Sequence, residues 1–294
     1  MYTHLLASAV TLCLARSALS ASITDDQSPK INPSKWNAAI SAPNATGAYP
    51  IRGFNISGPY SEEELPGWTM VVRVAVDRET GAAEDDEDHR TYFAGTSISI
   101  KAPDTLLETD GSVATVEVSQ DPEWNVQVFP TVTLSGDILD DAQNDDGSCL
   151  SFLSEQCVKD WQDAYVSSDV GWASPPSSCN KTLQGTGPLR NNNNNTVPLS
   201  MFNGTKLISY STTYSDLGHG PLQLQNAVRQ IVPVMMVYRQ SGQNGTASEA
   251  ARLSCVRARD LAGGSKLATG VANTSTALSR WALAPFILAA LLLL

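Results

Sequence analysis

Two acidic residues beside a tryptophan are the first whose types could carry out chemistry. Asp121 and Glu123 precede Trp124 at the expected entry to a strand. A glycosidase needs two carboxyl groups that face each other across the sugar, one of them held protonated by its surroundings. Acids are abundant in this chain, however, and an Asp-Pro turn followed by a core tryptophan explains the same residues. The turn is the favoured interpretation, and the acid pair is kept as a catalytic candidate.

A second catalytic candidate is the pair Asp216 and His219, which lies in a short segment that also contains Ser215. These are the residue types of a hydrolytic site, but a triad is assembled by the fold and not by adjacency in the chain. The chain contains no Gly-x-Ser-x-Gly nucleophile motif. A glycine-rich turn after a strand is therefore the favoured interpretation.

Acids also gather between Asp137 and Asp146, which suggests a calcium loop. An EF-hand with Gly147 at the sixth position would place Ala142 at the first position and Leu153 at the twelfth, where oxygen ligands are required. The EF-hand template therefore fails. The candidates for a looser metal site are Asp140, Asp141, Asp145 and Asp146. A solvated turn that caps a helix is the favoured alternative.

Strands with a two-residue period are expected to position these side chains. In the stretch 68–77, Met70, Val72, Val74 and Val76 share one face, which predicts a sheet with one buried side. The same alternation predicts strands over 92–101, 113–119 and 124–134. Pro130 interrupts the last of these and indicates an edge or a bulge.

Strand patterns return after a long interval, over 207–214, 227–239 and 252–259. The stretch 231–238 is almost wholly apolar, as expected of a central strand covered on both faces. We therefore expect a mostly β fold, a two-sheet antiparallel β-sandwich over 67–260, on which an N-terminal segment, 21–66, packs.

One α-helix is expected to be inserted into this sandwich around 148–165, where apolar residues recur at steps of three and four. Ser148 would cap this helix, and Asp145 and Asp146 would face the positive end of its dipole. A linker rich in proline, glycine and asparagine is expected over 171–197.

Both ends of the chain carry the pattern of a segment that is removed during processing. An apolar core, 5–15, is followed by small residues, so residues 1–20 are expected to be a signal peptide cut after Ser20, with Ser17 as the alternative. The tail, 281–294, is apolar to its last residue but shorter than the roughly 20 residues that cross a bilayer. A small and polar stalk, 261–280, precedes it.

This C-terminal pattern predicts a GPI-attachment signal, with Gly270 or Asn273 as the attachment residue. On this interpretation the tail is removed and a glycolipid holds the protein in the membrane. A short tail-anchored span is the alternative.

The cysteines that remain after the signal peptide are Cys149, Cys157, Cys179 and Cys255. An even number in a secreted chain indicates disulfides. Cys149 and Cys157 would lie about 12 Å apart along one helix, too far for a bond that needs α-carbons within about 7 Å. Each would then pair with Cys179 or Cys255, and we favour Cys157–Cys179, the shorter loop, with Cys149–Cys255.

The remaining composition limits the partners. The thiols are expected to be paired, and the mature chain has two histidines, His89 and His219. Few ligands therefore remain for a zinc or copper site, and no cofactor is expected. The formal net charge of −11 disfavours nucleic acid and anionic lipid surfaces. Trp68 and Trp172 are the candidates for stacking on a sugar.

N-glycosylation sequons recur along the chain and indicate surface loops. They begin at Asn44, Asn55, Asn180, Asn194, Asn203 and Asn244. A further sequon at Asn273 would leave with the tail unless that residue is the attachment point.

The layout of signal peptide, sequons, few paired cysteines, β-rich ectodomain and terminal GPI signal resembles that of fungal GPI-anchored cell-surface glycoproteins. The resemblance covers the whole chain and implies residence on the outer face of the plasma membrane or in the wall. It implies no activity, and the eight-cysteine haem-binding module of one subgroup is missing.

We therefore expect a non-catalytic surface glycoprotein that binds wall polysaccharide or another ectodomain, or contributes structurally. One alternative is a membrane-tethered glycoside hydrolase or transglycosylase that acts through Asp and Glu. The other is a calcium-dependent adhesion module.

Overall fold

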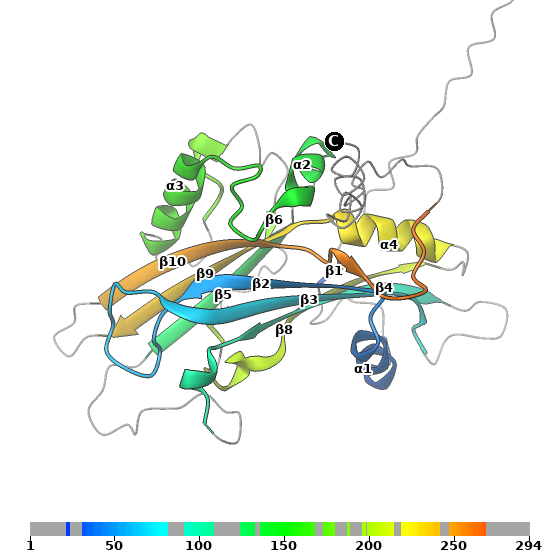
Figure 1. Ribbon diagram of the computed structural model, residues 1–294, viewed down its shortest axis with the longest axis horizontal. Helices are drawn as coiled ribbons and strands as arrows, with labels where there is room; N and C mark the ends of the chain where they lie inside the picture. Colours follow the sequence, from blue (N-terminus) through cyan, green and yellow to red (C-terminus); the bar gives the residue numbers. More distant parts are fainter. Residues whose placement is uncertain are drawn as a thin grey trace, which may run out of the picture.

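The computed structural model describes residues 22–23, 31–81, 91–108, 124–132, 136–167, 173–179, 187–188, 196–197, 199–214, 219–241 and 247–268. These residues form two antiparallel sheets that share one hydrophobic core (Figure 1). The mostly β, two-sheet antiparallel architecture predicted from the alternating strands is confirmed.

The larger sheet has six strands in the order β1-β8-β4-β3-β2-β11. Their bounds are β1 Ser22–Ile23, β2 Ala45–Gly53, β3 Leu65–Glu79, β4 Tyr92–Lys101, β8 Asn203–Tyr214 and β11 Asp260–Leu261. The strand β2 lies in the segment that was expected only to pack on the sandwich, and it pairs with β3 from Ala45 to Gly53. Its alternating burial shows the period that the sequence analysis overlooked.

The smaller sheet has five strands, in the order β10-β9-β5-β6, with β7 also paired to β5. Their bounds are β5 Trp124–Val132, β6 Gly187–Pro188, β7 Thr196–Val197, β9 Val232–Ser241 and β10 Ala247–Val256. β9 is the expected central strand, because it pairs with β10 on one side and with β5 on the other. Pro130 of β5 pairs with Val234 of β9, and on the other side of the strand it falls between the positions that pair with β7 and those that pair with β6.

The core between the sheets is built from the inward-facing residues of both. Trp68 of β3 is fully buried and meets Phe202 and Tyr238 edge to face, with ring centroids 5.5 and 6.1 Å apart. Its indole N–H donates to the carbonyl of Phe54 at 3.2 Å. Each such aromatic pair adds about 0.5–1.5 kcal/mol beyond the area that it buries.

Four α-helices lie in the described residues: α1 Pro33–Ser41, α2 Gly136–Asp141, α3 Glu155–Val166 and α4 Gly220–Arg229. In Figure 1, α1 lies on one side of the sheets and the other three helices lie on the opposite side. α1 stacks Trp36 on Phe93, against the outer face of the larger sheet. α3 covers the smaller sheet, where Trp161 and Tyr165 join an apolar cluster with Val237.

The helix expected over 148–165 begins later in the structure. Ser154 caps it by accepting from the N–H of Cys157, and α3 runs from Glu155 to Val166. Cys149 has a φ of 68°, which is incompatible with a helix, and Leu150 is 47% exposed. The carboxylate of Asp145 accepts from backbone N–H groups of this stretch and holds it in turns.

The strand expected over 227–239 is also corrected. Its first residues close the helix α4, which ends at Arg229, and β9 starts at Val232. The apolar residues Leu224 and Val228 recur four apart and join the inner core, so helical spacing was mistaken for the start of a strand. The strand expected over 113–119 lies outside the described residues, as do the signal peptide and the tail from 269 onward. None of the described helices is long and apolar enough to cross a bilayer.

Candidate ligand-binding groove

A groove with a volume of about 520 Å³ lies between β2 of the larger sheet and β10 of the smaller sheet. Five segments line it: the end of β2, the residue before β3, the loop before α3, one face of α3, and β10. The lining residues are Pro50, Ile51, Arg52, Glu64, Asp146, Gly147, Ser148, Val158, Gln162, Arg252, Leu253 and Ser254. Ligand sites commonly have volumes of about 300–1,000 Å³, so this groove is large enough to hold a small ligand.

The groove forms where the edges of the two sheets come together. The described partners of β10 lie along β9, and β11 pairs with β2 at Ala45 and Thr46, away from the groove end of that strand. Ile51 and Leu253 are each 7% exposed and form an aliphatic floor. The charged residues stand above this floor at the rim.

Arg252 is the more firmly held of the two arginines in the groove. Its Nε donates to Oε1 of Glu64 at 2.6 Å, and its Nη1 donates to the carbonyl of Ala251 at 2.7 Å. The guanidinium also lies 4.8 Å from the ring centroid of Phe54, a cation–π contact. Three different partners therefore fix the plane of this guanidinium.

Arg52 lies on the other side of the same carboxylate and is held far less tightly. Its Nη1 is 3.5 Å from Oε2 of Glu64, and its side chain is 78% exposed. An exposed ion pair with this geometry contributes at most about 1 kcal/mol. Arg52 can therefore leave Glu64 for a ligand at little cost.

Glu64 owes its position to the loop between β2 and β3, which the smaller sheet holds in place. The carbonyl of Gly58 accepts from Nε1 of Trp124 at 2.8 Å and from Nε2 of Gln240 at 3.0 Å. The N–H of Tyr60 donates to Oε1 of Gln240 at 2.6 Å. These bonds tie a loop of the larger sheet to β5 and β9, so the carboxylate is placed before any ligand arrives.

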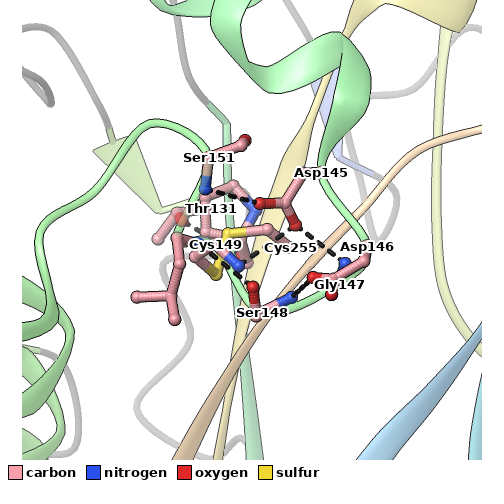
Figure 2. Close-up of a disulfide and its surroundings, with 10 residues drawn as sticks. Thr131, Asp145, Asp146, Gly147, Ser148, Cys149, Ser151 and Cys255 are labelled. Atoms are coloured by element: carbon pink, nitrogen blue, oxygen red, sulfur yellow. Dashed lines mark hydrogen bonds between the residues drawn. A yellow bond between two sulfur atoms is a disulfide. The ribbon is translucent and has the colours of Figure 1, made fainter.

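The opposite wall is a turn organised by Asp145 and a disulfide (Figure 2). Oδ1 of Asp145 accepts from the N–H groups of Gly147 and Cys149, at 2.8 and 3.1 Å, and Oδ2 accepts from that of Ser151 at 3.2 Å. Cys149 is bonded to Cys255 of β10. The turn is thereby joined to the strand that lines the other side of the groove.

Three residues of this turn, Asp146, Gly147 and Ser148, line the groove. Asp146 accepts from the N–H of Ser148 at 3.0 Å, and the hydrogen bonds from Ser148 lower the pKa of its carboxyl group. Asp146 therefore stays ionised, as a fixed acceptor at the rim.

A second hollow, of about 430 Å³, lies between α1 and the ends of β3 and β4. Asp77 lines it, in the left-handed region with a φ of 54°. The hydroxyl of Tyr214 accepts from the N–H of Asp77 at 2.8 Å and donates to its Oδ1 at 3.0 Å. Burial raises the pKa of Tyr214 above its ordinary value. These bonds satisfy the backbone of a bulge in β3, between Ala75 and Arg78, so we assign Asp77 a structural role.

The four acids considered as candidates for a loose metal site do not converge. Asp140 is paired with Arg229, and the oxygens of Asp145 are taken up by backbone N–H groups. Asp141 and Asp146 are exposed. The described part of the chain contains no group of three or more Asp, Glu, His or Cys side chains that could hold a metal ion.

Of the catalytic candidates, His219 alone falls on described residues. His219 is exposed and lies at the N-cap of α4, with Gly220 as the first helical residue. Asp121, Glu123 and Asp216 lie outside the described residues. Trp68, a candidate for stacking on sugars, is fully buried, and Trp172 also lies outside the described residues.

The favoured disulfide pairing, Cys149–Cys255 and Cys157–Cys179, is the one in the structure. The argument for it was partly wrong, because Cys149 is not in the helix. α3 instead carries Cys157, and the short 3-10 turn Ser177–Cys179 brings Cys179 to it.

Three sequons fall on described residues. Asn55 and Asn203 are exposed, and Oδ1 of Asn55 accepts from both the N–H and the hydroxyl of Ser57 within the sequon, at 3.0 and 2.7 Å. Asn44 is half-buried. Asn180, Asn194 and Asn244, and the attachment candidates Gly270 and Asn273, lie outside the described residues.

Sequence reasoning missed Arg52, Glu64 and Arg252 altogether. Arg252 and Glu64 are 188 positions apart, and no local spacing signals their meeting. A comparison of the chain with protein-family profiles, with curated protein sequences and with solved structures found no match.

Proposed function

We propose that this protein is a GPI-anchored extracellular glycoprotein of the cell surface or wall, with a non-catalytic binding role exerted through the groove between β2 and β10. Its partners are the membrane, through the glycolipid, and a wall polysaccharide or another ectodomain. Nucleic acid is not among them, because the chain carries a net charge of −11.

The pair of buried disulfides carries this proposal. All four cysteines are at most 1% exposed, and their bonds link the turn before α3 to β10 and α3 to the 3-10 turn at 177–179. Structural disulfides of this kind form in the secretory pathway and are rare in the cytosol. The exposed sequons at Asn55 and Asn203 agree with the same route.

The geometry of Glu64 supports a binding role over an acid–base role. One of its oxygens accepts from Arg252, and the other faces Arg52. A glycosidase acid must present a protonated oxygen to the leaving group, whereas here both oxygens face guanidinium groups. The groove thus offers fixed donors and acceptors.

Expression of the full chain in a eukaryotic host, with an epitope tag inserted between the exposed residues Gly263 and Gly264, tests whether the protein is held at the cell surface by a GPI anchor. We expect phosphatidylinositol-specific phospholipase C to release the protein from intact cells and glycosidase treatment to increase its mobility. A matched variant that ends at Arg280 should be secreted without phospholipase. Retention on phospholipase-treated cells, together with a C-terminal peptide that still contains Leu294, would contradict the proposal.

A further inference from the structure

We infer that the groove between β2 and β10 takes a neutral saccharide chain, on which Arg52 closes. This inference rests on the proposed function, because it names the ligand of the proposed binding site. It is carried by three properties of the groove: an aliphatic floor, a rim of planar polar side chains, and balanced charge.

The floor fits the apolar face of a sugar ring. Ile51 and Leu253 come from the two sheets and present aliphatic carbon with little exposure, and Val158 of α3 continues this surface. A pyranose ring carries C–H groups on its faces and hydroxyl groups around its edge. Burial of the C–H groups on the floor would leave the hydroxyl groups directed at the rim.

The rim provides both donors and acceptors. The guanidinium groups only donate, the carboxylates of Glu64 and Asp146 only accept, and the amide of Gln162 does both. A sugar hydroxyl is at once a donor and an acceptor, so it can bridge a guanidinium and a carboxylate. The Arg252–Glu64 pair, with its 2.6 Å bond, offers these two partners side by side.

The charges of the groove favour a neutral ligand. Two arginines, Arg52 and Arg252, are matched by two acids, Glu64 and Asp146. The groove therefore has no excess of positive charge with which to hold an anionic ligand such as a polyuronate. The whole chain is acidic and would repel such a ligand further.

A peptide partner fits this surface less well. An added peptide strand would draw its affinity from backbone groups along one sheet edge. In the groove, side chains from five segments come together instead, and this arrangement suits a ligand with hydroxyl groups all around its edge.

Arg52 provides the moving part of the site. Arg252 and Glu64 hold each other, so the departure of Arg52 from its 3.5 Å contact leaves the carboxylate paired. The exposed guanidinium can then fold over a bound sugar, while the rest of the site is already in place. A site of this kind pays little ordering entropy on binding.

The test is calorimetric titration of the protein, expressed from the full chain in a eukaryotic secretory pathway and purified with the processing and glycosylation that the host cell gives it. The probes are neutral hexasaccharides of β-1,3-glucan, chitin and mannan, a hexamer of polygalacturonate, and an acidic peptide. We expect at least one neutral hexasaccharide to bind, and Arg52→Ala to weaken that binding about ten-fold or more. Lys101→Ala should change nothing, because Lys101 is also an exposed cation paired with an acid, Asp104, but lies on β4 away from the groove.

Several outcomes would overturn the inference. Binding of only the polygalacturonate would make the groove an anion site, and binding of only the peptide would make it a protein-docking site. Saccharide binding that survives both Arg52→Ala and Arg252→Gln would place the sugar elsewhere, and binding of no probe would remove it. None of these results bears on the GPI anchor. If phospholipase fails to release the protein but saccharide binding is intact and depends on Arg52, then the GPI anchor is refuted and the binding site is not.

Discussion

The α-carbon of Gly220 lies directly against the carboxylate of Asp77. A β-carbon built on Gly220 would stand 1.5 Å from Oδ2 of Asp77 and 2.0 Å from its carboxyl carbon. Asp77 cannot move away easily, because its left-handed backbone and its two bonds with Tyr214 hold it in the bulge of β3. The start of α4 is thus fitted to the end of β3.

We therefore expect Gly220→Ala to destabilise the protein by more than about 1 kcal/mol, because the carboxylate must be displaced from Tyr214. Urea unfolding followed by tryptophan fluorescence measures the change. Gly263→Ala is the matched control, since a β-carbon added there would have no atom within 4 Å apart from those of the adjacent residues. This substitution should change the stability by less than about 0.5 kcal/mol. Equal effects of the two substitutions would contradict the proposed fit.

The turn around Asp145 should depend on one carboxylate. Asp145→Ala leaves the N–H groups of Gly147, Cys149 and Ser151 without their acceptor in a place where Asp145 is only 4% exposed. We expect a loss of about 3 kcal/mol or more in unfolding free energy. Asp146→Ala removes an exposed neighbour and should cost less than about 1 kcal/mol. Comparable losses for the two variants would show that the hydrogen bonds to Asp145 do not organise the turn.

The two disulfides should differ in their contribution to stability. Cys149–Cys255 closes a separation of 106 residues, and Cys157–Cys179 closes one of 22. Loop entropy predicts about 4.7 kcal/mol for a loop of about 100 residues and about 3 kcal/mol for a short one. The double variant Cys149→Ser/Cys255→Ser should therefore melt below Cys157→Ser/Cys179→Ser in a calorimetric scan. The reverse order would mean that local packing around α3 outweighs chain entropy.

Buried tyrosines should make the fold sensitive to alkali. Burial raises the pKa of Tyr210 to about 12 and raises the pKa values of Tyr165 and Tyr238 as well. The unfolded chain releases these protons near pH 10 while the folded chain keeps them, so folding stability is complete below about pH 10 and falls above it. Each fully buried tyrosine then costs up to about 1.4 kcal/mol per pH unit.

Urea unfolding at a series of alkaline pH values measures this slope, and absorbance of the ionised phenol at each pH follows the titration. Tyr210→Phe should make the slope shallower, because phenylalanine has no proton to lose. An unchanged slope in this variant would show that Tyr210 is not the group that titrates.

The sheets could be predicted because their pattern is local. Met70, Val72 and Val74 alternate with the half-buried residues Thr69, Val71 and Arg73, and the structure buries all three in the shared core. The start of α3 could not be predicted from the same kind of pattern. Leu150 and Leu153 continue the helical spacing of Cys157 and Trp161, but the carboxylate of Asp145 competes for the backbone N–H groups that the helix would need.

The groove was beyond the reach of sequence reasoning for a different reason. Arg52 and Glu64 flank a loop, whereas Arg252 comes from the far end of the chain, and each looks like an ordinary surface charge. Their convergence depends on how the edges of two sheets meet, which no spacing in the chain encodes. The acids considered for a calcium site are close together in the sequence only. In the structure Asp140 pairs with Arg229, Asp145 accepts from backbone N–H groups, and Asp141 and Asp146 are exposed.

Asn44 provides the last prediction, because its sequon coincides with a structural junction. Its Oδ1 accepts from the N–H of Val76 at 2.9 Å, next to the bulge in β3. Its carbonyl accepts from the N–H of Ala262 at 2.8 Å and from the hydroxyl of Ser265 at 2.9 Å, in the segment that follows β11. Asn44→Ala should therefore cost about 1–2 kcal/mol in unfolding free energy, whether or not the site carries a glycan.

Two matched variants separate the hydrogen bond from the glycan. Asn44→Asp keeps the acceptor oxygen but cannot be glycosylated, and Thr46→Val destroys the sequon while leaving Asn44 in place. We expect both to be more stable than Asn44→Ala in urea unfolding of protein from the same eukaryotic host. If all three variants lose the same stability, and enzymatic deglycosylation of the unmodified protein reproduces that loss, then the sugar and not the bond to Val76 stabilises this junction.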